Sequence, residues 1–503
     1  MKRGVLAAVL CGLTLFACAA QAEISGQYTY QIEENGTVSI TDFSWKEDQK
    51  DIYIPDILGG YRVTDIGEKA FARMADDHSD ETINVVVPNG IKSIGEKAFM
   101  NAPVSGVSIP ASVQQIGDGA FANCPISQFI LESENAMYAT IDGVLYNKMT
   151  KTLVAWPREK REGSVPEGIV EIGNYAVYGD TQIQGWIDQG WIDLIIDQGW
   201  IDLTTFIPST VEKIGNYAFA KNKAKVSAYY DIKAASFGEN VREIGEGAFQ
   251  HCVLQVTDPM GRNDMIIGDG AFEDAIFHDL NNNIWEGTVK AKKIGDRAFA
   301  YSFLYNATLD DEIIEIGESA FVCNTNRMRI LITTNSKLEK IGKGAFQYGE
   351  ELGYQYGSVL PNDGETFVTP RKVKDLSDYS FSHAFRKEDD RETGVNFTPC
   401  RKIEVSEGTE RIGNYTFEKN VLIESVTLPS TLTEIGVGAF QECPALTSIS
   451  IPSSVKKIGD GAFDRATITL EVEQNSYAAL WASENGYKYR YQGVTEDTSW
   501  LNP

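Results

Sequence analysis

The sequence predicts a repeat solenoid, because one short motif, which we call the phrase, recurs thirteen times along the chain. The phrase is Ile-Gly-x-x-Ala-Phe, and its clearest copy occupies residues 458–463. The tightest intervals between copies are 22 and 23 residues. The complete interval also holds a run of alternating apolar and polar residues, which is typical of a short strand. A unit of this size cannot bury its apolar face alone, so successive units must stack on one another.

Thirteen clear copies of the phrase occur between residues 66 and 463. One copy ends in Val177 where the others have Phe, and another has Thr416 where the others have Ala. A further, degenerate copy occupies residues 376–381. We interpret the longer intervals as the same unit carrying insertions. The clear copies begin at Ile66, Ile94, Ile116, Ile172, Ile214, Ile244, Ile267, Ile294, Ile316, Ile341, Ile412, Ile435 and Ile458.

One complete unit indicates which element each part of the repeat forms. Residues 446–452 alternate apolar and polar and then end in Pro, which predicts a short strand that Pro terminates. Val455 and Ile458 follow three residues apart and suit a tight turn that brings both side chains inward. Gly459 allows the backbone to reverse without a Cβ. Asp460 suits the N-cap of a short helical turn that carries the Ala-Phe pair into the interior.

This unit resembles the BspA-like leucine-rich repeats, whose pattern is roughly L-x-x-I-x-I-P-x-x-V-x-x-I-G-x-x-A-F-x-x-C. Cys443 supplies the last position of the preceding turn, and the resemblance covers about residues 23–492. It implies a leucine-rich-repeat-like right-handed coil of short parallel strands with short helical or irregular returns, capped at both ends. The positions matched within one turn are Leu446, Ile449, Ile451, Pro452, Val455, Ile458, Gly459, Ala462 and Phe463.

The same patterns divide the chain into segments. Two alternating runs joined by Asn35-Gly36 predict a hairpin near the start, and a helix-like spacing followed by alternation predicts a helix and a strand near the end. The predicted segments are residues 1–22, the signal peptide; 23–61, the N-terminal β cap; 62–465, the solenoid of about 14 turns with insertions at 126–165, 180–205 and 347–400; 466–492, the C-terminal cap; and 493–503, the tail.

The N-terminal residues predict export. Two basic residues precede the apolar run 5–16, and residues 20–22 are small enough for signal-peptide cleavage. Residues 15–18 also have the shape of a bacterial lipobox, which would leave Cys18 as a lipid anchor, but the bulky Phe16 fits that site poorly. The apolar run is too short for a stable membrane span. We therefore expect a secreted or cell-surface protein with no integral membrane span.

Two insertions have recognisable patterns. In the first, residues 138–147 and 152–157 predict two strands, which we interpret as structural decoration. In the second, residues 187–194 return unchanged as 196–203, and the segment contains Trp186, Trp191 and Trp200. Large rigid Trp side chains are good anchors for a partner. These three residues are therefore candidate partner-binding residues, and a neutral sequence duplication is the alternative.

The sequence offers little chemistry for catalysis or for a cofactor. None of the four His has a partner at a metal-site spacing, and no nucleophile or phosphate-loop motif is present. Asp, Asn or Glu follows Ile-Gly in eleven of the thirteen clear copies, which we attribute to capping and not to calcium binding. Cysteines at repeat positions should be buried free thiols, because disulfide partners would lie several turns apart. The five are Cys124, Cys252, Cys323, Cys400 and Cys443.

Charge and resemblance together indicate a function class. The net charge of −26 argues against nucleic-acid binding. The resemblance implies an exported, non-catalytic, adhesin-like bacterial protein that recognises host or neighbouring-cell proteins, among them extracellular-matrix or cell-surface proteins. The alternative is a structural or self-assembling cell-envelope protein. An enzyme has no sequence support beyond the unassigned carboxylates among 71 acidic residues.

Overall fold

The computed structural model describes much of the chain between residues 22 and 493, and it divides into two compact units, Met1–Met137 and Tyr138–Pro503. The two units are described separately. The described residues are 22–46, 49–76, 82–132, 134–160, 163–179, 201–202, 207–220, 231–234, 237, 240–256, 258–279, 285–304, 307–323, 330–333, 336–349, 359–360, 365–385 and 399–493.

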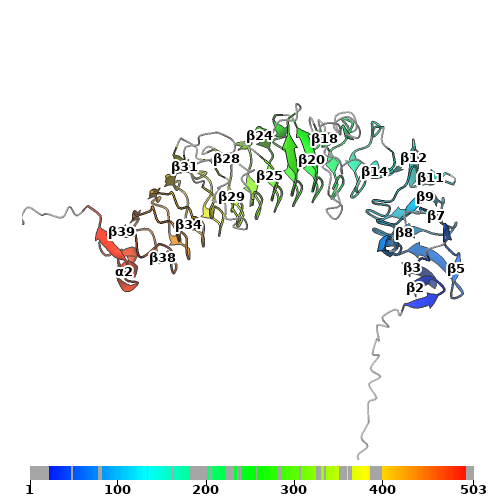
Figure 1. Cartoon of the computed structure of the whole chain (residues 1–503), viewed down its shortest axis with the longest axis horizontal. Helices are drawn as coiled ribbons and strands as arrows, with labels where there is room; N and C mark the ends of the chain where they lie inside the picture. Colours follow the sequence, from blue (N-terminus) through cyan, green and yellow to red (C-terminus); the bar gives the residue numbers. More distant parts are fainter. Residues whose placement is uncertain are drawn as a thin grey trace, which may run out of the picture. The chain divides into compact units, whose positions relative to one another are not determined.

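The N-terminal unit contains the predicted hairpin and two sheets (Figure 1). Strands β2 and β3 pair antiparallel across the Asn-Gly turn, and β3 then pairs parallel with β6. One sheet is β1 (Glu23–Ser25), β2 (Tyr28–Ile32), β3 (Thr37–Phe43), β6 (Tyr61–Ile66), β8 (Ser93–Ile94) and β10 (Gln115–Ile116), with β5 (Ile57–Leu58) beside β6. The other is β4 (Asp51–Tyr53), β7 (Ile83–Val86), β9 (Val104–Ile109) and β11 (Ile130–Leu131), and the 3-10 helix η1 is Ala72–Asp76.

The C-terminal unit is a β-solenoid in which each turn contributes one short strand to a single 14-stranded sheet. We call this the short-strand sheet. From β14 onward its pairings are all parallel, so the Ile of each phrase lies beside the Ile of the next turn. Its strands are β12 (Tyr138–Ile141), β13 (Val144–Asn147), β14 (Thr152–Ala155), β15 (Glu171–Ile172), β17 (Lys213–Ile214), β19 (Glu243–Ile244), β22 (Ile266–Ile267), β25 (Lys293–Ile294), β27 (Glu315–Ile316), β29 (Lys340–Ile341), β32 (Asp375–Leu376), β34 (Arg411–Ile412), β36 (Glu434–Ile435) and β38 (Lys457–Ile458).

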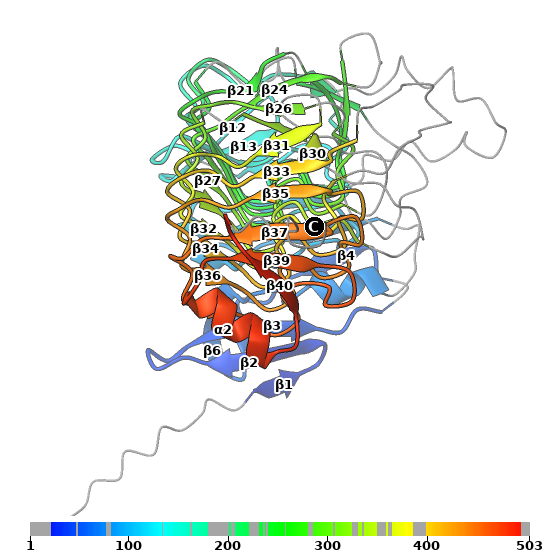
Figure 2. The same cartoon turned by 90° about the vertical axis from the view of Figure 1, so that its left-hand side faces the viewer.

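The remaining strands belong to a set of smaller parallel sheets, which we call the long-strand sheets, and the turns that end in β22, β25 and β32 contribute two such strands each. Figure 2 shows β31, β33, β35, β37, β39 and β40 stacked one beside the next. The long strands are β16 (Ile201–Asp202), β18 (Asp231–Ala234), β20 (Val253–Val256), β21 (Met260–Gly261), β23 (Ile276–His278), β24 (Gly287–Lys290), β26 (Ala307–Leu309), β28 (Ile330–Ile332), β30 (Val359–Leu360), β31 (Thr366–Val368), β33 (Lys402–Glu404), β35 (Ser425–Thr427), β37 (Ser448–Ile451), β39 (Thr469–Val472) and β40 (Lys488–Tyr491).

The core between the two kinds of sheet is a column of stacked Phe rings. Phe249 and Phe299 have no exposed surface, as the phrase predicted for interior residues. From Phe219 to Phe463, consecutive rings of the column are 5.1 to 5.8 Å apart and nearly parallel. One ring per turn fills the interior at the spacing of stacked strands. The fold class predicted from the sequence is thus confirmed.

The Gly of the phrase has a different role from the one we expected. A Cβ on Gly459 would lie 2.4 Å from the backbone nitrogen of Val437 in the preceding turn, and one on Gly342 would lie 2.3 Å from a backbone carbon of Gly317. The phrase therefore needs Gly because adjacent turns approach closely here. The backbone reaches positive φ two residues later, at φ 61° in Gly461.

The short helical turn expected after Asp460 is also absent from the described corner, which is a series of turns. The left-handed conformation of Gly461 explains this, because one αL residue interrupts helical geometry. The first insertion differs as well: it forms three strands and not two, since Asp142 and Gly143 adopt positive φ and split the first run into β12 and β13.

The C-terminal elements agree with the sequence pattern. Helix α2 is Tyr477–Glu484, and Ser476 caps it by accepting a hydrogen bond from Ala479 N–H at 3.2 Å. The strand β40 follows, as the alternation predicted. No helix of the described residues combines the length and the apolar character of a bilayer span.

The five cysteines are buried free thiols, as their repeat positions predicted. The thiols of Cys124, Cys252 and Cys443 donate to main-chain carbonyls of the Phe column in a preceding turn, at 2.9, 3.2 and 3.2 Å. Burial raises the pKa of Cys400 and of Cys443 to about 12. These cysteines therefore act as small core side chains.

Candidate binding faces of the solenoid

The residues singled out from the sequence as binding candidates cannot be placed. Trp186, Trp191 and Trp200 lie outside the described residues, as does Cys18. The described C-terminal unit has two outward faces that are candidate binding surfaces, one on the short-strand sheet and one on the long-strand sheets.

The outward side chains of the short-strand sheet alternate in charge from turn to turn. The apolar residue of each strand from β15 to β38 is at most 5% exposed, so the residue before it points outward. We call this outward row the charge ladder. It contains five carboxylates and five cations, in strict alternation except at Ile266, which is 44% exposed. Its members are Glu171, Lys213, Glu243, Ile266, Lys293, Glu315, Lys340, Asp375, Arg411, Glu434 and Lys457.

Neighbouring members of the charge ladder form ion pairs across turns. Lys213 Nζ lies 3.2 Å from Glu243 Oε1 and 3.7 Å from a carboxylate oxygen of the preceding turn. Glu315 lies between Lys293 and Lys340, with Nζ-to-oxygen distances of 3.1 and 2.6 Å. The hydrogen bond from Lys340, together with both positive charges, outweighs burial and holds the pKa of Glu315 below its usual value. Most charged side chains of this face are therefore already paired with one another in ion pairs.

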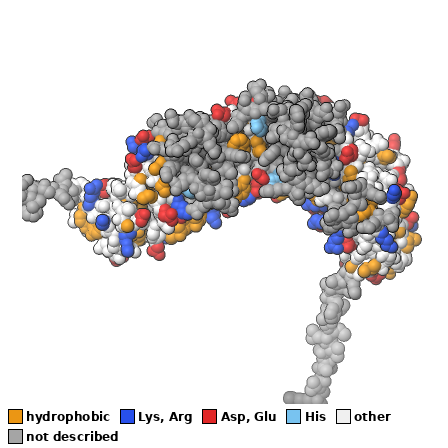
Figure 3. Space-filling view, in the orientation of Figure 1, with side chains coloured by type: hydrophobic (Ala, Val, Ile, Leu, Met, Phe, Trp, Pro, Cys, Tyr) orange, Lys and Arg blue, Asp and Glu red, His pale blue; other side chains and the backbone are white. Residues whose placement is uncertain are grey.

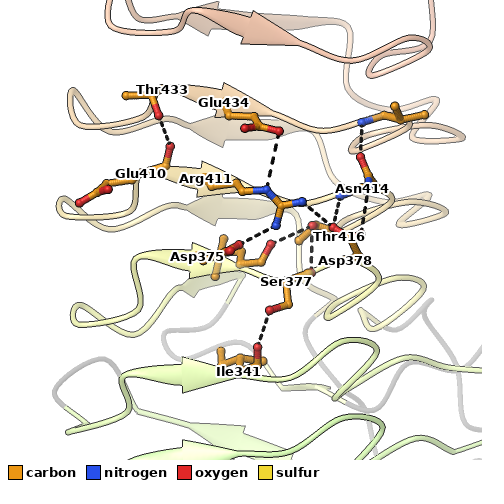
Figure 4. A network of polar contacts seen from close by, with 12 residues as sticks. Ile341, Asp375, Ser377, Asp378, Glu410, Arg411, Asn414, Thr416, Thr433 and Glu434 are labelled. Atoms are coloured by element: carbon orange, nitrogen blue, oxygen red, sulfur yellow. Dashed lines mark hydrogen bonds and ion pairs between the residues drawn. The ribbon is translucent and has the colours of Figure 1, made fainter. Parts of the chain in front are cut away.

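Arg411 is the centre of the densest part of the ladder (Figure 4). Its guanidinium nitrogens lie 2.8 Å from Asp375 Oδ1, 2.7 Å from Asp378 Oδ1 and 3.7 Å from Glu434 Oε1. Burial alone would raise the pKa of Asp378. The hydrogen bonds from the Asn414 N–H and from Arg411 outweigh burial and lower that pKa. Four charged side chains from three turns are thereby joined.

The Asp and Asn side chains that follow Ile-Gly connect turns and do not cap a helix. Asn174 Oδ1 accepts from the N–H of Asn216 in the next turn at 2.7 Å, and Asn414 Oδ1 accepts from the N–H of Val437 at 2.8 Å. The capping interpretation was correct in assigning these oxygens to backbone N–H groups, but it placed the donors in the wrong turn. Among the described residues, no group of three or more His, Cys, Asp or Glu could hold a metal ion.

The long-strand face near the C-terminus presents small hydroxyl side chains. Their apolar neighbours Ile449 and Leu470 are buried, so the alternate residues point outward. Among them, Ser450 donates to Glu471 Oε2 at 2.5 Å, whereas Ser425 and Ser448 have no side-chain hydrogen bond within the described parts of the chain. We call this surface the hydroxyl face. It consists of Ser425, Thr427, Ser448, Ser450 and Thr469 on β35, β37 and β39.

Charged residues border the hydroxyl face on both sides. Lys402 and Glu404 are exposed on β33, and Lys488 and Arg490 are exposed on β40. Basic and acidic side chains are mixed over the C-terminal unit (Figure 3). Ser450 is hydrogen-bonded to Glu471, but Arg490 pairs with the same carboxylate and lowers its pKa, which makes this carboxylate a weak base.

Sequence reasoning missed both faces, although signals for them existed. From Glu171 onward the residue at the position before Ile-Gly in the aligned copies alternates between acid and base except at Ile266, as in Glu315 and Lys340. The hydroxyl face requires knowing which strands are neighbours, because its members are about one repeat apart in sequence. Ser448 and Thr469 are opposite each other in the β37–β39 pairing, for example.

A match to a protein-family model establishes the family of the chain. The description of that model is "BspA type Leucine rich repeat region (6 copies)", and it matches residues 64–152, 202–276, 224–353 and 395–476, which is more than half of the chain. The chain belongs to this BspA-type leucine-rich repeat family. The chain matches none of the curated protein sequences with which it was compared.

Solved structures of other proteins also match the chain, at low identity and low TM-score. A leucine-rich cell surface protein from Faecalibacterium prausnitzii A2-165 is 15% identical, with 96% of this chain and 97% of that chain covered and a TM-score of 0.32. A leucine-rich repeat protein from Bacteroides ovatus ATCC 8483 is 15% identical, with 90% and 100% covered and a TM-score of 0.30. The pneumococcal vaccine antigen PcpA is 12% identical, with 94% and 99% covered and a TM-score of 0.25.

Proposed function

We propose that this BspA-type protein is an exported, non-catalytic protein that binds other proteins at a cell surface, and that its hydroxyl face makes the contact. Family membership supports a surface protein-binding role. The observation that carries the proposal is the row of exposed hydroxyls on β35 and β37, of which Ser425 and Ser448 have no side-chain hydrogen bond to the described residues. Solenoids present long, regular surfaces of this kind to extended partners.

The hydroxyl face is better suited to binding than the charge ladder. A partner on the ladder would have to remove water from ion pairs such as Lys213–Glu243, and that desolvation offsets much of what new contacts contribute. Ser and Thr lose little side-chain entropy when they are ordered, and each hydroxyl can donate or accept. The preferred partner is therefore an extended polar protein segment, with complementary charges for Lys402 and Glu404 at the border.

We further propose an adhesin-like role in which the partner is a host or neighbouring-cell protein. The test is a screen of the mature chain, residues 23–503, against immobilised host extracellular-matrix and cell-surface proteins. Ser448→Arg places a long cation in the centre of the hydroxyl face and should weaken capture at least tenfold, which is about 1.4 kcal/mol. Thr433→Arg makes the same change to an exposed hydroxyl residue beside the ladder and should leave capture within twofold.

Two results would overturn this proposal. The first is a screen in which the intact mature chain captures no protein. The second is a captured protein that Thr433→Arg releases and Ser448→Arg does not, which would move the contact to the charge ladder. Trp186, Trp191 and Trp200 remain a proposed second contact. Deleting residues 184–203 should weaken capture of the same protein, and unchanged capture would favour the neutral duplication.

A further inference from the structure

The first and last long strands of the chain each have one edge that no described strand covers. β4 ends the order β11-β9-β7-β4, and β40 ends the order β37-β39-β40. Each runs parallel to its single partner. Elsewhere at the ends, the antiparallel strands β1 to β3 precede β6, and helix α2 contacts β38, β39 and β40, while no described strand pairs with the outer edge of β40. An open strand edge is a place where another chain can add a strand.

The backbone of β4 shows which of its groups point away from β7. Lys50 C=O accepts from a β7 N–H at 3.0 Å, and Ile54 N–H donates to a β7 carbonyl at 3.2 Å. Backbone groups of a strand alternate between its two edges, so Asp51 and Tyr53 direct their N–H and C=O groups to the open side.

Two side chains of the N-terminal unit reach these outward groups. The Tyr28 hydroxyl donates to Tyr53 C=O at 3.0 Å, and Gln49 Nε2 donates to Asp51 C=O at 3.4 Å. Both contacts are to carbonyl oxygens, each of which has a second lone pair. The outward N–H groups of Asp51 and Tyr53 have no partner among the described residues.

The same reasoning applies to β40. Gln492 N–H donates to Val472 C=O of β39 at 3.0 Å. Lys488, Arg490 and Gln492 therefore face β39, and Tyr489 and Tyr491 direct their backbone groups to the open side. Those outward groups have no partner within the described residues.

The side chains of the two open strands are complementary. Asp51 and Tyr53 are exposed on β4, and Ile52 between them is buried. Lys488 and Arg490 are exposed on β40, on the side of the sheet that continues from the exposed residues of β39. Arg490 is paired with Glu471 of β39, so the match between the two edges rests on the exposed Asp51 at one and the exposed Lys488 at the other.

Exposed apolar side chains also concentrate near these ends. Solenoid caps need a polar outer face for solubility. Yet the described part of the N-terminal cap exposes Ile24 by 77% and Tyr53 by 68%, and helix α2 exposes Leu480 by 58%. Of the fifteen large apolar side chains exposed in the described chain, eight lie in the two end regions. They are Ile24, Tyr53, Ile57, Tyr61, Tyr477, Leu480, Tyr489 and Tyr491.

We propose that β40 of one molecule adds as a parallel strand to β4 of a second copy of this chain. The outward groups fit one register in which Tyr489 is opposite Ile52, because its N–H then meets Asp51 C=O and its C=O meets the Tyr53 N–H. That register sets Lys488 opposite Asp51 and Arg490 opposite Tyr53. It therefore adds a Lys488–Asp51 ion pair to the backbone bonds, whereas Arg490 is already paired with Glu471 of β39.

The contact uses different surfaces on the two molecules and leaves one open edge at each end of every assembly. Such a heterologous contact continues from copy to copy unless it closes into a ring. Sedimentation of the mature chain, residues 23–503, over a range of concentrations should show species larger than dimers. A chain that stays monomeric, or that stops at a dimer, would overturn the proposal.

A charge swap tests the register. Lys488→Glu or Asp51→Lys alone should weaken association at least fivefold, and one chain carrying both changes should recover most of the loss. Lys402→Glu is the matched control, because Lys402 is exposed on an interior strand, and it should leave association within twofold. Equal weakening by Lys402→Glu, or no recovery in the double variant, would contradict this register.

Two proline variants test the polarity of the contact. Tyr489→Pro and Tyr53→Pro each remove one outward N–H without removing a bond to β39 or β7. Each variant alone should stay monomeric, and an equimolar mixture should form heterodimers that grow no further, because one intact edge of each kind remains. A mixture that stays monomeric would overturn the head-to-tail contact, provided that each variant retains the circular dichroism of the parent.

Cross-linking gives an independent measurement that does not depend on the proline variants folding. Parallel strands lie about 4.8 Å apart, within the Cα separation of about 7 Å that a disulfide tolerates. A chain with Lys488→Cys and Asp51→Cys should form a series of covalent oligomers on oxidation, since its five native thiols are buried. The Lys402→Cys and Asp51→Cys pair should form none.

The chain's own C-terminal tail could pair with the open edge of β40 in place of a second copy. Deleting residues 494–503 distinguishes pairing with the tail from pairing with a second copy. If a second copy occupies the edge, the truncated chain should associate as the full chain does. If association appears only after truncation, the tail covers β40 in the full chain and the proposal is overturned.

Discussion

The C-terminal unit presents two faces that differ in how far their side chains are occupied with one another. Along the charge ladder, five carboxylates and five cations alternate, and ion pairs of 2.6 to 3.7 Å join neighbouring turns. On the hydroxyl face, Ser425 and Ser448 point outward without partners in the described residues. Both faces follow the same backbone turn, so the difference comes from the side chains alone.

The contrast shows how one solenoid can use one face to fix the register of its turns and the other face to bind a partner. A shift of one turn would place Glu315 beside another acid and Lys340 beside another base, so the alternation favours a single stacking of turns. The ladder charges cancel although the whole chain carries a net charge of −26, so the acidic excess lies elsewhere. The hydroxyl face contributes little to register and leaves its hydrogen-bonding groups available.

The largest loss of stability should come from a substitution in the Phe column, which forms the core beneath both faces. Phe249→Ala removes a fully buried ring between Phe219 and Phe272 and should cost about 3–5 kcal/mol. Solenoid turns couple mainly to their neighbours, so hydrogen exchange should rise first in the adjacent turns. An even rise over the whole chain would contradict this nearest-neighbour coupling.

The burial of repeat residues such as Phe249 could be predicted because they recur periodically in the sequence, and the strands and the C-terminal helix could be predicted from their local patterns. The incorrect predictions concern residues whose roles depend on distances between turns. Gly459 was assigned to a chain reversal, whereas its role is set by the backbone of Val437 in the turn before it. Asn414 was interpreted as a cap within its own turn, whereas it accepts from the N–H of Val437 in the next. A pattern within one unit contains no information on such contacts.

The second prediction removes the centre of the ladder. Arg411→Met takes away the partner of Asp375, Asp378 and Glu434 and should lower the free energy of unfolding by about 1–2 kcal/mol at neutral pH, because the network is partly buried. Denaturant unfolding at pH 7 measures this. An unchanged midpoint would mean that the three carboxylates relax into water without loss.

The pH dependence of the same variant follows from the lowered pKa of Asp378. A carboxyl whose folded pKa lies below its unfolded value, about 3.9, stabilises the fold above that value and loses the contribution as pH falls through the folded pKa. The parent should therefore lose stability on acidification below about pH 4, and Arg411→Met should lose less. Parallel pH profiles for the two proteins would contradict a role for the pair.

A smaller effect is expected from reversing one ladder charge. Glu315→Lys places three cations in succession with Lys293 and Lys340 and should destabilise by about 1 kcal/mol, since the charges are partly exposed. The loss should shrink in high salt, because the Debye length falls to about 3 Å at 1 M. Thermal unfolding at low and high salt measures both. A loss that salt does not change would point to packing and not to charge.

The smallest effect should come from the same residue placed on the other face. Ser448→Lys adds an exposed cation on β37 where no side-chain hydrogen bond is lost, and surface changes of this kind usually stay within about 0.5 kcal/mol. Its unfolding should match that of the parent at low and high salt, in contrast to Glu315→Lys. A loss as large as that of Glu315→Lys would mean that the hydroxyl face also holds the turns in register. The division of roles between the two faces would then fail, because binding and stability would depend on the same side chains.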